Sequence, residues 1–108
     1  MALKHAQAMD VIDLLMIGAH QERVSSTSLL KTSRIQLIRM ALPAGHVLPE
    51  HHVPGEITIH CLSGEAEVTT PTRASRLAAG TLVMLPAAEP HGVRAFLDTL
   101  LLVTVFQA

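Results

Sequence analysis

The 108-residue chain has no tryptophan and no tyrosine, and its only aromatic residues by the usual count are two phenylalanines. A stacking platform for nucleic-acid bases or sugars is therefore missing. Because hydrophobic residues still make up 49% of the chain, its core must be built from aliphatic side chains and methionine. At this length the chain can form one such core and not two, which predicts a single domain.

Charge and cysteine are also scarce. The formal net charge is -1 and lysines and arginines form no run, so the chain lacks the basic surface that nucleic acid or an anionic membrane would require. A single cysteine, Cys61, cannot form an internal disulfide, which favours a reducing compartment and predicts a cytoplasmic protein. Its position in an apolar stretch favours core packing over a reactive thiol.

Long apolar runs are missing as well. The longest, at residues 99–106 (TLLLVTVF), is far shorter than the roughly 20 residues of a membrane-spanning helix and is typical of a buried strand. It carries apolar residues on both faces, with Leu101, Val103 and Val105 on one and Leu100, Leu102 and Phe106 on the other. Burial of both faces in so small a domain predicts that one of them packs against a second subunit, as in a homodimer.

The chain does contain short alternating stretches separated by glycine and proline turns. In residues 65–69 (EAEVT), for example, Ala66 and Val68 point to one side and the glutamates to the other. The pattern predicts eight or nine strands in an all-β sandwich or barrel that occupies residues 25–108. Residues 1–24 form a separate N-terminal segment, in which Asp10 as a cap and Gly18 as a stop favour a short helix. The predicted strands cover residues 25–32, 34–42, 46–53, 57–62, 65–69, 73–78, 81–85, 93–97 and 100–106.

Histidines are concentrated in one stretch. Four of the seven lie between Gly45 and Gly64, in the sequence GHVLPEHHVPGEITIHCLSG. A proline-rich loop farther on presents His91, directly after Pro90. Imidazoles serve as metal ligands and as proton donors and acceptors, so these two regions are the candidates for chemistry.

The spacing of these residues resembles the two motifs of the cupin family, G-x5-H-x-H-x3,4-E-x6-G and G-x5-P-x-G-x2-H-x3-N. Gly45, His51 and Gly64 match the first motif. Gly80, Pro86 and His91 match the second in register, and the similarity extends over residues 34–106. The resemblance implies a double-stranded β-helix (jelly-roll) barrel that is often dimeric.

The resemblance also implies a metal site, in which two histidines and an acid of the first motif join the histidine of the second around a transition metal. Here the second histidine falls on Val53 and the acid on Ile57, so only His51 and His91 are matched. The implied cofactor is one divalent transition metal (Fe, Mn, Ni or Zn) at these two residues. Since catalytic zinc sites usually have three protein ligands, two imidazoles alone form a weak site.

Two nearby residues are candidates for completing the ligand set. Glu56 lies one residue short of the acid's register and faces the pocket only if a bulge or the preceding turn resets the strand. By the alternation of side chains along a strand, His60 should point away from the pocket, yet it interrupts an otherwise apolar strand. It is therefore either a third ligand or a hydrogen-bonded histidine in the core or in a subunit interface. The remaining predicted pocket residues are Val53, Ile57, Ile59, Cys61 and Met84.

Three functions follow from these observations and remain open at this level, including whether the protein is an enzyme. The first is a small metal-dependent enzyme of the dioxygenase or isomerase type that acts on a small organic molecule. The second is a metal-free module that binds a small ligand in the barrel. The third is a structural or regulatory homodimer.

Overall fold

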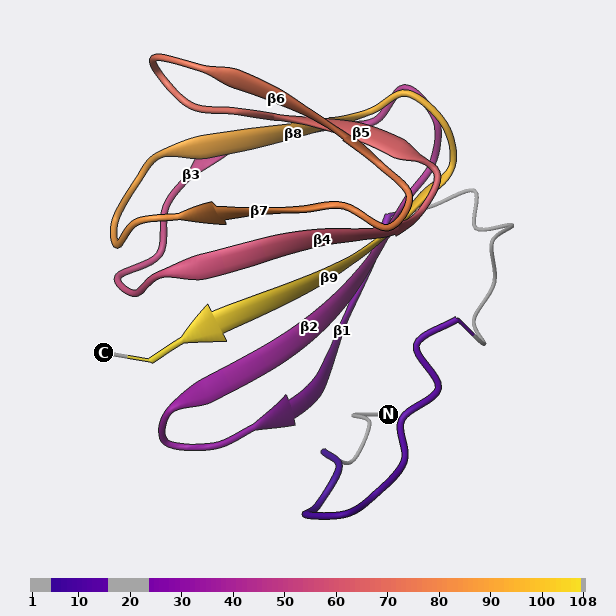
Figure 1. The fold of residues 1–108 in the computed structure, drawn as a ribbon, viewed down its shortest axis with the longest axis vertical. Coiled ribbons are helices and arrows are strands. Elements are labelled where there is room, and N and C mark those ends of the chain that lie inside the picture. Colours follow the sequence, from indigo (N-terminus) through magenta and orange to yellow (C-terminus); the bar gives the residue numbers. More distant parts are fainter. Residues whose placement is uncertain (1–4, 16–23, 108) are drawn as a thin grey trace.

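The structure, a computed structural model, describes residues 5–15 and 24–107, and within these ranges the chain forms nine strands and no helix (Figure 1). The all-β prediction is confirmed. In the described part of the chain no helix is long and apolar enough to cross a membrane. The strands are Ser25–Lys31 (β1), Ile35–Leu42 (β2), Val47–His51 (β3), Ile57–Ser63 (β4), Glu65–Thr69 (β5), Ala74–Ala78 (β6), Leu82–Leu85 (β7), His91–Ala95 (β8) and Thr99–Phe106 (β9).

The strands form two antiparallel sheets that face each other. One sheet has five strands in the order β1-β2-β9-β4-β7, and the other has four in the order β3-β8-β5-β6. The chain passes from one sheet to the other between β2 and β3, β3 and β4, β4 and β5, β6 and β7, β7 and β8, and β8 and β9, so the two sheets are wound together as a jelly roll. Figure 1 shows them fanning out from the side where β4 meets β5.

The core lies between the sheets and follows from the alternation of side chains along each strand. In β4, for example, Ile57, Ile59 and Cys61 are buried, whereas Thr58 and His60 between them are only partly buried. Leu101 on β9 has no exposed surface. The aliphatic core expected from the composition is thus confirmed. The buried cluster comprises Leu42, Ile57, Ile59, Cys61, Ala66, Val68, Leu77, Leu85, Val93, Ala95 and Leu101.

The helix predicted for residues 10–18 is wrong over residues 10–15, which are irregular, and its remaining residues lie outside the described ranges. The carboxylate of Asp10 accepts a hydrogen bond from the Gln7 backbone and that of Asp13 from the Leu15 backbone, so both aspartates form local turns. The carbonyls of Asp13 and Leu14, which a helix would use internally, accept hydrogen bonds from the guanidinium of Arg39.

The turn between β4 and β5 depends on Gly64, which has a positive φ of 85°. A Cβ at this position would lie 2.8 Å from Cα of Thr99 and would also collide with the carbonyl oxygen of Asp98. Gly80, between β6 and β7, has a similar φ of 87°, yet a Cβ there would meet no atom within 4 Å. The two glycines therefore share a backbone conformation but differ in their surroundings.

We expect Gly64→Ala to destabilise the protein far more than Gly80→Ala. The left-handed backbone alone should reduce the free energy of unfolding by about 1–2 kcal/mol in either variant, and only Gly64→Ala adds a steric clash with β9. Urea denaturation of both variants measures the difference. Equal losses of stability would show that the β4–β5 turn does not pack against Thr99 as described.

Candidate functional site

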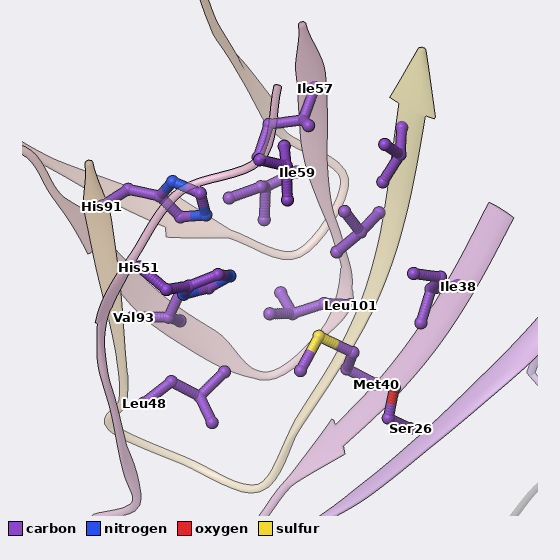
Figure 2. Close-up of a pocket in the computed structure, with 13 residues that line it drawn as sticks. Ser26, Ile38, Met40, Leu48, His51, Ile57, Ile59, His91, Val93 and Leu101 are labelled. Atoms are coloured by element: carbon purple, nitrogen blue, oxygen red, sulfur yellow. The ribbon is translucent and has the colours of Figure 1, made fainter. Parts of the chain in front are cut away.

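A cavity of about 210 Å³ lies between the two sheets, and Figure 2 shows the thirteen side chains that line it. Ten of them are aliphatic or methionine, and only His51, His91 and Ser26 bring polar atoms. No Asp, Glu, Lys or Arg is among them. The lining residues are Ser26, Ile38, Met40, Leu48, His51, Val53, Ile57, Ile59, His91, Val93, Leu101, Val103 and Val105.

The two histidines stand side by side on the wall formed by the four-stranded sheet. His51 on β3 and His91 on β8 are register partners, and their ring centroids are 4.4 Å apart with the rings tilted by 53°. Both rings project from the same wall into the cavity (Figure 2). His91 is 3% exposed, whereas His51 is accessible to solvent.

A bulge in β3 brings His51 to this position. Leu48 pairs with Val93 and His51 pairs with His91, so three residue steps on β3 correspond to two on β8. In a regular strand Leu48 and His51 would point to opposite faces. The extra residue resets the alternation, and both side chains face the cavity.

A backbone carbonyl lies within hydrogen-bond distance of Nδ1 in each ring. Nδ1 of His91 lies 3.0 Å from the carbonyl oxygen of Glu89, and Nδ1 of His51 lies 3.4 Å from that of Pro49. A carbonyl oxygen can only accept, so each Nδ1 carries the hydrogen and donates it. In the neutral ring each Nε2 is then left with a lone pair, free to accept a hydrogen bond or to bind a metal.

Three of the aliphatic residues predicted for the pocket, Val53, Ile57 and Ile59, line the cavity. Cys61 lies on the same inward face of β4 as Ile57 and Ile59, but it is in the closed core and does not line the cavity. It has no exposed surface. Its thiol donates to the carbonyl oxygen of Ser63. Burial raises the pKa of the Cys61 thiol, the nearby Glu65 carboxylate raises it further, and the hydrogen bond to Ser63 acts in the opposite direction.

The other three predicted pocket residues lie elsewhere. Glu56 is exposed and does not line the cavity. His60 pairs with Leu82 and Leu102 on the outer face of the five-stranded sheet. Met84 is 56% exposed on the same outer face, because the inward positions of β7 belong to Val83 and Leu85. Thus neither Glu56 nor His60 approaches the pair of histidines.

Eight lining residues were not predicted. The alternation of residues 99–106 already placed Leu101 with Val103 and Val105 on a common face, but it could not say which face was inside. For Leu48 the sequence carried no signal, because its orientation depends on the bulge. The eight residues are Ser26, Ile38, Met40, Leu48, Val93, Leu101, Val103 and Val105.

The donor set does not fit a complete metal site. Across residues 5–15 and 24–107 no three histidine, cysteine, aspartate or glutamate side chains come close enough together to hold an ion. Val53 and Ile57, at the positions where the cupin motifs carry a histidine and an acid, face the same cavity as the histidine pair. Apolar side chains therefore stand where two ligands would have to be.

Comparison with known proteins identifies the family. A family model described as "Cupin domain" matches residues 38–105, and the chain belongs to the cupin family. The cupin resemblance of the sequence is confirmed. A search of curated protein sequences finds no significant match.

Solved structures share the fold over most of the chain. A cupin superfamily protein from Desulfitobacterium hafniense is 20% identical, with a TM-score of 0.83 over 100% of this chain and 99% of that one. An RmlC-like cupin from Desulfovibrio desulfuricans is 27% identical, with a TM-score of 0.81 over 91% and 96%. The DMSP lyase DddQ from Ruegeria pomeroyi is 24% identical, with a TM-score of 0.72 over 86% of this chain and 51% of that one.

We expect the wild-type protein to bind divalent metals weakly, and the double variant Val53→His/Ile57→Glu to bind them tightly. The substitutions would add two donors to the wall that already holds His51 and His91, giving four ligands in one cavity. Titration of Zn²⁺, Ni²⁺, Mn²⁺ and Fe²⁺ into chelator-treated protein measures both affinities. His51→Ala/His91→Ala is the matched control that should abolish any binding. Micromolar or tighter binding by the wild-type protein, lost in this control, would contradict the expectation.

Proposed function

We propose that this cupin binds a small, mostly apolar organic molecule in the cavity between its sheets, with the polar end of the molecule at His51 and His91. The observation that carries the proposal is the composition of the cavity wall. Two adjacent imidazole rings are the only source of side-chain nitrogen in a lining that otherwise consists of aliphatic side chains, Met40 and Ser26. Ligand sites commonly combine an apolar surface with a few convergent polar groups in this way.

The size of the cavity supports the same conclusion. An engineered protein cavity of about 150 Å³ holds a benzene molecule, and the cavity here has about 210 Å³. It therefore has room for a ring or short branched chain with one substituent. Apolar walls contribute affinity through burial of the ligand surface, and the histidines orient the polar end.

A second candidate function is a metal-dependent enzyme of the dioxygenase or isomerase type. The observation in its favour is that two Nε2 lone pairs share one wall of a cavity able to hold a substrate. His51 and His91 would hold Fe, Mn, Ni or Zn, which would supply Lewis-acid or redox chemistry, and the other coordination positions would fall to substrate or solvent. A fold neighbour is described as a lyase, which supports this candidate at the level of the fold. The incomplete ligand set makes this the weaker candidate.

We also propose that the protein is a cytoplasmic homodimer that associates through the outer face of the five-stranded sheet. That face carries exposed apolar side chains: Leu82 is 58% exposed, Met84 56% and Phe106 43%. The only Asp, Glu, Lys or Arg among the outward residues of β2, β4, β7 and β9 is Arg39, which is 6% exposed and already bonded to the carbonyls of Asp13 and Leu14.

The properties of this face favour a second copy over a charged partner. With no free charge to complement, an uncharged and equally apolar surface is the best match, and a two-fold interface brings the same patch from both subunits. At β2 the carbonyls of residues 13 and 14 already cover Arg39, so the surface left for a partner lies over β4, β7 and β9.

A substitution that fills the cavity should abolish binding. Screening of neutral and ionic fragments of up to about ten heavy atoms by ligand-observed NMR should yield ligands of the wild-type protein that no longer bind Val103→Phe. Val103 lies on the cavity wall, and a phenyl group there would occupy the space of the ligand. Val47→Phe, on the solvent-facing side of β3, is the matched control and should keep binding. A screen without ligands, or ligands that still bind Val103→Phe, would contradict the proposal.

Charged substitutions on β7 should separate the subunits. We expect the wild-type protein to sediment at micromolar concentration with twice its chain mass of 11.6 kDa, and Leu82→Lys/Met84→Lys to sediment as a monomer with unchanged circular dichroism. Val47→Lys, equally exposed at 56% but on the other sheet, should remain dimeric. A monomeric wild-type protein would overturn the proposal.

A further inference from the structure

The hydrogen bonds of the histidine pair restrict which polar group can lie beside it. We infer that the cavity takes a neutral molecule with a hydrogen-bond-donating hydroxyl head, such as an alcohol or a phenol, on an apolar body. The inference rests on the proposed ligand-binding function and specifies the chemical class of the ligand. The inference depends on which ring nitrogens already form hydrogen bonds to the protein.

The buried ring of His91 carries most of the argument. Its Nδ1–H donates to the carbonyl oxygen of Glu89 at 3.0 Å, so its Nε2 must be the acceptor nitrogen of the neutral ring. Within the described residues no side-chain nitrogen or oxygen is both fully buried and without a hydrogen-bond partner. The Nε2 of His91 makes no hydrogen bond to those residues, so it must be reached from the cavity. An occupant that offers no donor would bury this lone pair unsatisfied, which is unfavourable.

His51 presents the same kind of atom on the same wall. Its Nδ1 is directed at the carbonyl oxygen of Pro49 at 3.4 Å, which leaves its Nε2 as a second acceptor beside the first. A ketone, an ether or a carboxylate carries only acceptors, and beside the neutral rings it would set its lone pairs against these two nitrogens. A hydroxyl group can donate to one of them.

The lining of the cavity argues against a cationic donor. An ammonium group would satisfy both nitrogens, but no aspartate or glutamate lines the cavity to balance its charge. Removing an unpaired charge from water into aliphatic surroundings is strongly unfavourable. Donation from a neutral hydroxyl satisfies the lone pair without that penalty.

The rest of the ligand is defined by the opposite side of the cavity. Ile38, Met40 and Leu101 lie across from the histidines in Figure 2, and Ser26 lies at the far end. The first three provide an apolar surface for the body of the molecule. The Ser26 hydroxyl can both donate and accept, so it does not select between head groups.

The test compares matched probes by isothermal titration calorimetry. Phenol and toluene have the same shape and differ in one donor, so wild-type protein should bind phenol about fivefold or more tighter than toluene, as expected for one net hydrogen bond. Benzoate and benzylamine, which carry charged heads, should bind more weakly than phenol. In His91→Leu the preference for phenol over toluene should fall to about one.

Two further variants make the result specific. His60→Leu removes a histidine from the outer face of the same barrel and should keep the preference for phenol. His51→Leu removes the solvent-accessible histidine of the pair and should reduce the preference for phenol over toluene. This variant provides a second test if His91→Leu does not fold. Equal binding of phenol and toluene, or tighter binding of either charged probe, would overturn the hydroxyl inference and leave the proposed binding function intact. If none of the four probes bound, the proposed function would fail and the inference with it.

Discussion

The pairing of β3 with β8 determines how the two histidines of the cavity are arranged, and the proposed function depends on that arrangement. One extra residue between Leu48 and His51 lets both face inward, so the apolar wall continues up to the histidine pair without a break. Without the bulge His51 would point to solvent and His91 would face the cavity alone. The neighbouring carbonyls of Pro49 and Glu89 then hold the two rings by Nδ1. Because the fold orders these rings in advance, a ligand loses little free energy in arranging them.

The aliphatic residues around the pair decide how it can be used. Val53 and Ile57 occupy wall positions from which donors could join His51 and His91, and they bring hydrocarbon instead. Two lone pairs in such surroundings favour a partner that is small, uncharged and able to donate. A cation without further donors would be poorly coordinated at the same place. Replacing Val53 and Ile57 by side chains with donor atoms would therefore be enough to change what the two imidazoles can bind.

Much of this arrangement could be predicted from sequence. Glycine and proline turns between alternating stretches located the strands, and motif spacing located His51 and His91. The direction in which side chains point was harder to predict where a strand is apolar on both faces. In β7 (Leu82–Leu85) either Met84 or Val83 could face inward, and only the register with β4 shows that Val83 does. The bulge after Leu48 depends on pairing between residues at least 40 positions apart, and no local pattern in β3 signals it.

The strand β9 connects the interior of the barrel with its outer face. Leu101 and Val103 form part of the cavity wall, whereas Leu102 and Phe106 point away from it toward the proposed partner subunit. His51 and Ser26, the solvent-accessible polar residues of the cavity, belong to the inward side of the two sheets. A second copy packed on Leu82 and the outward residues of β9 would bury this strand on both faces without covering those two residues. The proposed dimer face and the proposed ligand cavity would therefore lie on opposite faces of the five-stranded sheet, and the alternation of β9 would contribute side chains to both.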